Sequence, residues 1–389
     1  MKVNRFSANV GQAINKVNQY AIDKKHIVGS VVMVAKEGQI IYQQASGHAD
    51  KEQKSTMQVD SQFLLSSVTK PIVSAAALCL VEKGLLKLDS PVTDYLPYFT
   101  PKLENGQQPV ITLHHLLTHS AGLKYRFCEP HGEGIYNTLQ ISDGFDQIAT
   151  DLDENLHRLS KAPLLFAPGT NWCYSLALDV LGGVLTAVTQ QPLEEIIKTT
   201  ITIPLNMANT GFTIPDNNQL VTHYYNALPE PLPMPSPYFM QLDESWNNGI
   251  VSYDPKRIFN PKAYHSGGAG MVGTAPDFMQ FLLSLTSINT DLSNNKLMDT
   301  MAKCYISSEY GTKGPGWGFG YGGAVLDDPI LAQTPQSKGT IQWGGVYGHN
   351  WFYDPQQELA VVILTNTAIE GMLGHYPVKI RDAIYHCLA

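Results

Sequence analysis

The sequence predicts an α+β fold in which one antiparallel sheet is assembled from both ends of the chain and flanked by helices. Two pairs of β-rich runs, each joined by a short turn, indicate one hairpin near each end. The long stretch between the hairpins has mostly helical patterns, so we expect an inserted helical region there. The predicted sheet region covers residues 1–65 and 290–389, the helical region covers residues 66–289, and the candidate site lies at their junction.

The first elements follow from the spacing of apolar residues. From Val10 to Ala21 they recur every three or four positions, which predicts an amphipathic helix over about residues 8–25 with Ser7 as its N-cap. The first hairpin then comprises residues 30–35 and 39–45, with its turn at Glu37-Gly38.

The C-terminal part of the chain repeats this arrangement in reverse order. β-rich runs over residues 346–353 and 358–364 flank a proline-containing turn at 354–357, which predicts the second hairpin. A closing helix follows from about Pro377 to the end of the sequence.

The inserted region carries several helix signals and one long loop signal. Apolar periodicity and capping residues predict helices over residues 112–119, 144–159, 175–189, 192–197 and 276–285, the last with Thr274 as its N-cap. Between residues 228 and 264, alternating prolines and interspersed aromatic residues predict an irregular loop. Long loops in compact domains are usually functional, so we interpret this one as a wall or lid of a site, with a solvent-exposed linker as the alternative.

The stretch 66–81 contains a Ser-x-x-Lys sequence, from Ser67 to Lys70, at the beginning of an unusually apolar segment. Pro71 has no N–H to donate and is tolerated only near a helix start, so the helix begins close to Ser67. Positions i and i+3 share a helix face, which places Ser67 beside Lys70. A segment that is apolar on every face predicts a buried helix, and burial favours the neutral amine of a lysine, which can accept a proton.

A Ser-x-x-Lys sequence is weakly specific by itself, because a chain of this length should contain about one by chance. A second one, from Ser293 to Lys296, lies in a polar, Asn-rich stretch without an apolar helix behind it. We interpret it as an accident in a surface loop. The plainer alternatives for the first one are an N-cap role for Ser67 and an ordinary first-turn position for Lys70.

Composition excludes several classes of partner. The net charge is −8 and the chain has no Lys/Arg block that offers a track for phosphates, which argues against nucleic acid.

The five cysteines are scattered without a Cys-x-x-Cys pair, which fits a reducing compartment. Residues 1–20 lack the apolar core of a signal peptide and no apolar run reaches the length of a membrane span, so we expect a cytoplasmic protein. We expect no cofactor, and the sequence leaves the oligomeric state open.

Three further histidine or glycine patterns have structural interpretations. His115 and His119 are spaced as a zinc pair would be, but no Glu follows His115 and no third ligand is evident, so no metal is expected. His349 suggests a Ser-His-Asp triad, yet the chain contains no Gly-x-Ser-x-Gly sequence. The Gly-rich stretch 266–270 lacks the Lys-Ser/Thr ending of a phosphate loop and predicts a tight turn into a strand.

Four stretches in a fixed order carry a family resemblance. They are Ser67-Val-Thr-Lys70, the stretch Thr112–Leu123 (TLHHLLTHSAGL), the stretch Pro168–Leu176 (PGTNWCYSL) and Trp343-Gly344-Gly345-Val346. With these motifs the chain resembles the class C β-lactamases and penicillin-binding-protein-like serine hydrolases, and most closely the carboxylesterases of that superfamily (family VIII). The resemblance covers nearly the whole chain, and four ordered motifs are far more specific than any one of them.

The resemblance implies a β-lactamase/transpeptidase-like fold and a role for each matching residue. Ser67 matches the nucleophile, Lys70 the adjacent base and Tyr174 the tyrosine of the Tyr-x-Asn element. Trp343-Gly344-Gly345 stands where the family has Lys-Thr-Gly. The backbone N–H groups of Ser67 and Val346 match the two donors of the oxyanion hole.

Two departures from the family pattern bear on the substrate. Leu176 occupies the position of the Asn that orients a peptide-like acyl side chain, and Trp343 replaces the Lys that faces a substrate carboxylate. An indole offers only apolar area and one N–H in place of a cation. Both changes favour neutral esters over β-lactams and peptidoglycan termini, although Trp343 packed on the sheet is an equal alternative.

We therefore predict a serine carboxylesterase for short or medium acyl esters that forms an acyl-enzyme on Ser67. Lys70 and Tyr174 form a coupled base pair, and the sequence does not assign the proton between them. The alternatives are a β-lactamase or D-alanyl carboxypeptidase, an acyltransferase, and an inactive relative that binds ligands. Besides Trp343, Gly344 and Gly345, the predicted pocket residues are aromatic residues near the motifs, namely Tyr125, Tyr238, Trp246 and Trp351.

Overall fold

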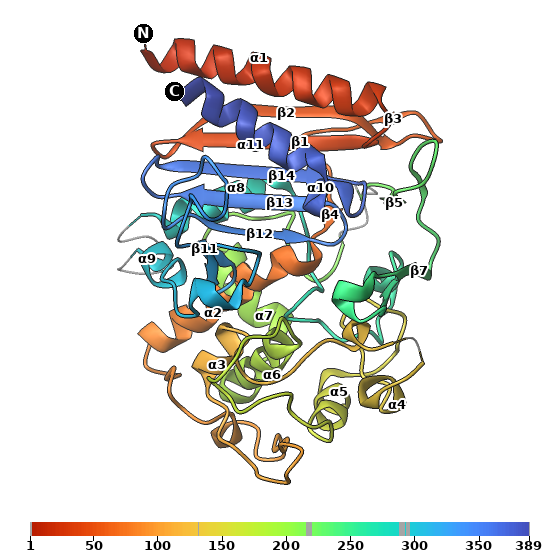
Figure 1. Cartoon of the computed structure of the whole chain (residues 1–389), viewed down its shortest axis with the longest axis vertical. Coiled ribbons are helices and arrows are strands. Elements are labelled where there is room, and N and C mark those ends of the chain that lie inside the picture. The colour runs from red at the N-terminus through yellow and green to blue at the C-terminus, as the bar shows by residue number, and fades with distance from the viewer. Residues whose placement is uncertain (1, 131, 215–219, 288–291, 293–295, 389) are drawn as a thin grey trace.

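An eight-stranded antiparallel sheet forms the upper part of the molecule in Figure 1. The computed structural model describes residues 2–130, 132–214, 220–287, 292 and 296–388. Within that part of the chain, the strand order is β10-β11-β12-β13-β14-β1-β2-β3. The adjacent central strands β1 (Gly29–Lys36) and β14 (Leu359–Thr365) come from opposite ends of the chain and pair antiparallel. The predicted α+β fold with a sheet from both chain ends is confirmed.

Both predicted hairpins are present in this sheet. The other strands are β2 (Gln39–Asp50), β3 (Ser55–Thr56), β10 (Trp317–Phe319), β11 (Ala324–Leu326), β12 (Ile341–Gly345) and β13 (His349–Asp354). The turn between β1 and β2 has positive φ at Glu37 and Gly38, as a tight two-residue hairpin requires. The turn between β13 and β14 is held by the Asp354 carboxylate, which accepts the backbone N–H groups of Gln356 and Gln357.

Helices cover both faces of the sheet, and side-chain alternation along the strands decides which face each residue meets. α1 (Lys2–Asp23) and α11 (His375–Leu388) pack on one face, where they meet Val32 of β1 and Ile363 of β14. α8 (Ala275–Leu285) packs on the opposite face against β1 and β14. Figure 1 shows α1 and α11 side by side over the sheet, with the two termini at the same end. Both faces are therefore buried, which accounts for the continuous apolar runs of the central strands.

The helical region lies below the sheet in Figure 1 and is centred on α2 (Thr69–Glu82), which is buried over most of its length and packs against α6 (Ala177–Thr189). A 3₁₀ turn, η1 (Ser66–Val68), leads directly into α2. The remaining helices are α3 (Leu113–Leu117), α4 (Ile135–Thr138), α5 (Leu152–Leu159), α7 (Leu193–Ile197), α9 (Leu297–Met301) and α10 (Glu370–Leu373). α8 falls within the predicted helical region by sequence but packs on the sheet.

Short strand pairs connect the two parts. β4 (Phe63–Leu64) pairs with β9 (Val272–Gly273), which brings the turn before α2 beside the glycine-rich stretch before β9. The other two pairs are β5 (Tyr224–Tyr225) with β6 (Leu232–Pro233), and β7 (Tyr238–Gln241) with β8 (Ile250–Tyr253). The prediction of a wholly irregular loop over residues 228–264 is therefore wrong in part, because β6 and the β7–β8 hairpin lie within it.

Two helix boundaries also differ from the prediction. α1 begins at Lys2, so Ser7 lies inside the helix, where its hydroxyl donates to the Ile41 carbonyl instead of capping. Of the segment 144–159, only α5 is helical, with Asp151 as its N-cap, because the residues before it are engaged in side-chain hydrogen bonds. Thr274 caps α8 as predicted. The second Ser-x-x-Lys sequence, at 293–296, lies mostly outside the described residues.

Candidate active site

Ser67 lies in the 3₁₀ turn η1, at the point where β4 ends and the buried helix α2 begins. Neither η1 nor α2 has a side-chain N-cap, so the alternative in which Ser67 merely caps the helix does not hold. The preceding residue, Ser66, has a positive φ of 42°, an uncommon conformation for a residue with a side chain. Hydrogen bonds tie the turn to the stretch before β9, from Leu65 N to Met271 O (2.8 Å) and from Met271 N to Thr69 Oγ1 (3.2 Å).

Two side chains converge on the Ser67 hydroxyl. Tyr174 OH lies 2.7 Å from Ser67 Oγ, and Lys70 Nζ lies 3.2 Å from the same atom. Lys70 is completely buried, donates to the Gly268 carbonyl at 2.7 Å and lies 4.6 Å from the centre of the Tyr174 ring. Both candidate bases are therefore within hydrogen-bond reach of the candidate nucleophile, as general-base catalysis requires.

His119 fixes the backbone on both sides of Tyr174. Its carbonyl accepts the N–H of Cys173 at 3.0 Å, and its ring Nδ1 lies 3.2 Å from both the N–H and the hydroxyl of Ser175. Burial lowers the pKa of His119 well below its ordinary value, so the ring is neutral and Nδ1 accepts the Ser175 N–H. His119 is thus a structural histidine in the sense predicted, and it positions Tyr174.

The end of β12 lies directly against the nucleophile turn. A methyl group built on Gly345 would lie 2.5 Å from the Leu65 carbonyl and 2.6 Å from Ser66 Oγ, so only glycine fits there. Val346 follows at once and begins the turn into β13. Trp343, two residues before Gly345 on the same face of β12, donates its indole N–H to Tyr174 OH at 3.3 Å.

A carboxyl group is buried behind Lys70. Asp179, in the first turn of α6, is completely buried, and neither of its oxygens has a hydrogen-bond partner of standard geometry among the described residues. Burial raises its pKa to about 6, against the opposing influence of Ser266, Lys70, Arg257 and the Gly268 backbone.

Tyr125 packs on the inner side of the cluster. It is 1% exposed, its ring centre lies 5.2 Å from that of Tyr174, and Lys70 Nζ lies 5.4 Å from its centre. Phe127 stacks on Tyr125 at 4.6 Å, and Trp246 lies 6.1 Å from Phe127 at the surface. These rings form a continuous aromatic row from the surface to Tyr174.

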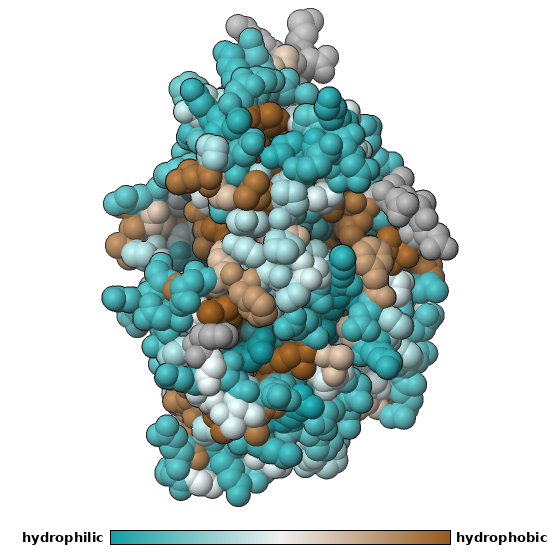
Figure 2. All heavy atoms as spheres, turned by 90° about the vertical axis from the view of Figure 1, so that its right-hand side faces the viewer, coloured by the Kyte–Doolittle hydropathy of each residue, from teal (hydrophilic) through white to brown (hydrophobic). Residues whose placement is uncertain are grey.

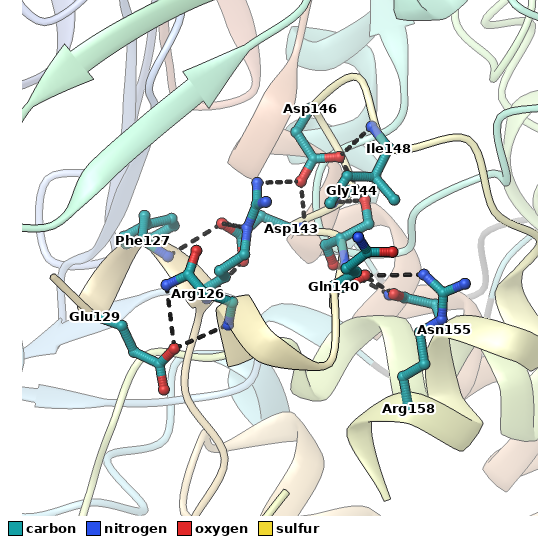
Figure 3. A network of polar contacts seen from close by, with 12 residues as sticks. Arg126, Phe127, Glu129, Gln140, Asp143, Gly144, Asp146, Ile148, Asn155 and Arg158 are labelled. Carbon is teal, nitrogen blue, oxygen red and sulfur yellow. Dashed lines mark hydrogen bonds and ion pairs between the residues drawn. The ribbon is translucent and has the colours of Figure 1, made fainter. Parts of the chain in front are cut away.

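A buried polar network, which we call the loop network, holds the segment that carries this row (Figure 3). Its members are Arg126, Ser142, Asp143, Asp146 and Asn155. The Asp143 carboxylate accepts the backbone N–H groups of Arg126 (2.7 Å) and Phe127 (3.2 Å), and Arg126 pairs with Asp146 at 2.8 Å. Because Asp143 binds the backbone of Phe127 itself, the network positions the aromatic wall of the site.

The other predicted pocket residues have neighbours outside the Ser67 cluster. Tyr238 stacks on Tyr225 at 4.4 Å in the β5/β7 region. Trp351 is 1% exposed and packs against Phe278 of α8 in the core, so it does not line a pocket. Gly344 faces α10 and not the site, since a methyl group there would lie 2.9 Å from Met372. Aromatic character and closeness in sequence could not distinguish these faces.

Three residues of the cluster were not predicted as site residues. They are Gly268, His119 and Asp179. Gly268 lies in the glycine-rich stretch that was interpreted only as a turn into a strand, and Asp179 occupies the first turn of a predicted helix, where acidic residues are common. His349, by contrast, lies away from any triad and its Nε2 contacts the Leu64 carbonyl at 2.9 Å.

The described residues contain no group of three or more His, Cys, Asp or Glu side chains arranged to hold a metal ion. The two members of the candidate zinc pair diverge, since His115 Nδ1 accepts the backbone N–H of Thr112 in a capping box whereas His119 points into the core. Over the same residues, none of the helices combines the length and the hydropathy needed to cross a bilayer.

Comparison with known proteins identifies the family. The sequence model of the family described as Beta-lactamase matches residues 12–378. The chain therefore belongs to the beta-lactamase family. Within this family, it is 46% identical over 379 residues to Esterase EstB of Burkholderia gladioli, an alignment that covers 97% of this chain and 96% of that protein. It is 27% identical over 381 residues to Lovastatin esterase of Penicillium rubens, with 88% and 90% covered.

Solved structures agree with the observed fold. EstCE1, described as a hydrolase with promiscuous acyltransferase activity, has a TM-score of 0.93 at 46% identity and covers 97% of this chain and 99% of its own. Simvastatin synthase LovD from Aspergillus terreus has a TM-score of 0.75 at 21% identity, with 96% and 97% covered, and supports the fold alone. The predicted membership of the β-lactamase-like superfamily, close to its esterases, is confirmed.

Proposed function

We propose that this protein is a serine carboxylesterase that cleaves short or medium acyl esters through an acyl-enzyme on Ser67. The observation that carries the proposal is the convergence of Tyr174 OH and Lys70 Nζ on Ser67 Oγ at 2.7 and 3.2 Å. The descriptions of EstB as an esterase and of EstCE1 as a hydrolase with promiscuous acyltransferase activity, each 46% identical to this chain, support an ester as the substrate.

The chemistry proceeds in two acyl-transfer steps. In the first, the Tyr174–Lys70 pair takes the proton of Ser67, Ser67 Oγ forms a bond to the ester carbonyl carbon, and the departing alkoxide receives that proton as it leaves. In the second, water attacks the acyl-enzyme, gives its proton to the same pair, and the proton returns to Ser67 Oγ as the acid departs. The N–H groups of Ser67 and Val346 hold the carbonyl oxygen, each contributing about 3 kcal/mol in the transition state.

The residues around Ser67 favour neutral esters over β-lactams. Leu176, at the position of the family Asn, is completely buried and offers no amide to a substrate. Trp343, at the position of the family Lys, uses its N–H on Tyr174 and otherwise presents apolar surface. The site therefore lacks both the amide and the cation that would recognise a peptide-like, carboxylate-bearing substrate.

A cavity of about 310 Å³ lies near the nucleophile turn, and it is the candidate space for part of an acyl group, with Ser67, Lys70 and Tyr174 outside its lining. Its lining includes Leu64 of β4, Met271, which hydrogen-bonds to the nucleophile turn, and Tyr347, which follows Val346. Most of the other lining side chains are apolar or aromatic, among them Phe145, Phe212, Ile214, Ile258, Phe259 and Tyr264. Figure 2 shows that hydrophobic residues on the face it presents are interspersed among hydrophilic ones, without one continuous apolar patch.

Acyl transfer to an alcohol is the second candidate, because EstCE1 is described as having promiscuous acyltransferase activity. In that reaction an alcohol replaces water in the second step. The yield of new ester would rise with the concentration of an added alcohol while release of the first leaving group stays constant.

Labelling with a fluorophosphonate tests the proposal, because such a reagent reacts with an activated serine. We expect the wild-type protein to be labelled, the Ser67→Ala variant to remain unlabelled, and p-nitrophenyl butyrate to be hydrolysed faster than a chromogenic cephalosporin. Equal labelling of Ser67→Ala, or no labelling of the wild type, would show that Ser67 is not the nucleophile. Faster turnover of the cephalosporin would replace the esterase by a β-lactamase.

A further inference from the structure

The carboxyl group of Asp179 is completely buried, and the Ser266 hydroxyl and the Gly268 backbone N–H approach it only at geometries outside the usual hydrogen-bond range. Most buried polar groups are hydrogen-bonded, because an unpaired one loses its hydration without compensation. A first-turn Asp often caps its helix, but neither oxygen of Asp179 has a partner of standard geometry, so capping does not explain it. A group that costs stability in this way needs another reason to be there.

Gly268 brings Asp179 together with the candidate active site. A methyl group built on Gly268 would lie 2.7 Å from Asp179 Oδ2, 3.2 Å from Tyr125 OH and 3.6 Å from Lys70 Nζ. The three groups therefore surround one backbone position, where an added methyl group would press on the Asp179 carboxyl. The other polar groups that act on Asp179 are Arg257, Tyr264 and Ser266.

Lys70 requires a negative charge nearby if it is an ammonium. It is completely buried and forms no ion pair with the described residues, and its hydrogen bonds are to the Gly268 carbonyl and to Ser67 Oγ. A buried ammonium without a counter-charge is strongly disfavoured. Asp179, on the far side of Gly268, is positioned to supply that charge.

We propose that Asp179 is a positioning residue whose carboxylate keeps Lys70 as the ammonium, so that Tyr174, as the phenolate, takes the proton of Ser67. The inference rests on the proposed function and deepens it. The Ser67 proton moves to the Tyr174 oxygen while Ser67 Oγ bonds to the carbonyl carbon, and the phenol then gives that proton to the leaving alkoxide. Lys70 and Asp179 keep their protonation states throughout.

The geometry around Tyr174 agrees with this assignment. Its oxygen is closer to Ser67 Oγ than Lys70 Nζ is, at 2.7 against 3.2 Å. The indole N–H of Trp343 also donates to it, at 3.3 Å, and a hydrogen bond to the charged form of a group favours that form. From the sequence alone, burial favours the neutral amine of Lys70, but the proton stays unassigned between Lys70 and Tyr174, because the carboxyl behind Lys70 is brought there only by tertiary packing.

The buried charge has a measurable signature in stability. Burial raises the pKa of Asp179 to about 6, above its ordinary value of 3.8. The stabilising contribution of the protonated group is complete below about pH 4 and is lost as the pH rises through 6, where the folded protein must ionise it. Replacing Asp179 by Asn removes this pH-dependent loss of stability, so the variant gains stability relative to the wild type as the pH rises.

The test compares Asp179→Asn with Asp277→Asn, a matched control. Asp277 is also a buried first-turn aspartate, but it lies in α8 on the sheet and accepts hydrogen bonds from the Asn209 N–H and the Thr210 hydroxyl at 2.9 Å each.

Two quantities are measured from pH 5 to pH 9, the rate of fluorophosphonate labelling and the melting temperature. For Asp179→Asn we expect labelling to slow about 10- to 100-fold at pH 7.5, a range typical of general-base effects, with loss of the wild-type acid limb near pH 6. Its melting temperature relative to the wild type should rise from pH 5 to pH 8.

The control should have a lower melting temperature than the wild type, because it loses a buried acceptor, and an unchanged labelling rate. Burial also raises the pKa of Asp277, so this difference in melting temperature should narrow as the pH rises, and the labelling rate is the readout that separates the two variants. Unchanged or faster labelling of Asp179→Asn would overturn the inference, and faster labelling would assign the base to neutral Lys70. If Asp179→Asn lost both stability and labelling rate while the pH dependence of its labelling matched that of the wild type, Asp179 would have only a structural role. Absence of Ser67-dependent labelling in the wild type would instead defeat the proposed function, and the melting temperatures would still decide whether Asp179 is a buried charge.

Discussion

Two buried polar clusters lie next to each other in this protein and are satisfied to very different degrees. In the loop network, Asp146 accepts from Arg126, from the Ser142 hydroxyl and from two backbone N–H groups (Figure 3). In the candidate active site, the Asp179 carboxyl has no hydrogen bond of standard geometry and Lys70 forms no ion pair with the described residues. A buried polar cluster stabilises the fold when all its groups are hydrogen-bonded. An unpaired buried charge costs stability, and such charges are retained where the chemistry of a site uses them.

The backbone of the candidate active site has two uncommon conformations. Ser66, in the Ser67 turn, and His119, which holds the backbone around Tyr174, both have positive φ, at 42° and 56°. Such conformations persist only where surrounding contacts impose them, and they concentrate at functional sites. The segment that carries the loop network has this conformation too, at Gln140 and Gly144, with φ of 52° and 85°. The contrast between the two clusters therefore lies in their hydrogen bonds, and it leads to four predictions.

The largest effect is expected from Tyr174→Phe, which removes the hydroxyl 2.7 Å from Ser67 Oγ while keeping the ring. We expect kcat/KM for a p-nitrophenyl ester to fall about 10²- to 10⁴-fold, because a general base is lost. The melting temperature should change little. Tyr98→Phe is the control, since its hydroxyl donates to the exposed Asp153 at 2.7 Å and full activity is expected. Retention of most activity in Tyr174→Phe would remove Tyr174 from the mechanism.

The next effect concerns the stability of the loop network. Asp146→Asn leaves Arg126 without its charged partner, and breaking a buried pair costs about 3–5 kcal/mol, of which we expect the lower end because Arg126 is 18% exposed. Urea unfolding measures this loss. The pH dependence of labelling should keep its shape, since the network does not contact Ser67. A changed pH profile would mean that the two clusters act as one.

A smaller effect concerns pH and Asp143. Burial raises the pKa of Asp143 to about 7, although Arg126 opposes the shift, so its stabilising contribution is complete below about pH 4 and is lost as the pH rises through 7. Asp143→Asn should be less stable than the wild type at pH 5, because it loses an acceptor for a backbone N–H, and the difference should shrink by pH 8. Melting temperatures at both pH values test this, with the exposed Asp153→Asn as control. A difference independent of pH would contradict it.

The smallest effect is expected from Trp343→Phe, which retains apolar area but removes the N–H that donates to Tyr174 OH. A hydrogen bond of this kind contributes about 1 kcal/mol, so kcat/KM should fall about fivefold. Trp172→Phe is the matched control, because its indole also packs on Phe319 but its N–H has no partner among the described residues. Equal losses in both variants would show that packing and not the N–H matters.

The sequence alone determined the local parts of this protein. The Ser67–Lys70 pair follows from helical spacing, the buried α2 from an apolar segment, and both hairpins from β-rich runs around turn residues. Each of these features depends on residues close together in the chain, where covalent geometry fixes the neighbours. The family resemblance extended this to Tyr174, whose role as a partner of Ser67 stays a proposal.

Only the tertiary structure decided which distant residues meet. Gly268 is separated from Lys70 by almost two hundred positions, yet its carbonyl accepts from Lys70 Nζ. Sheet register turned Trp351 into the core, although its sequence neighbourhood suggested a pocket wall. Asp179 likewise looked like an ordinary first-turn acid until packing removed it from water and placed it beside a buried lysine. Such contacts depend on how separate elements pack, and no local pattern records that.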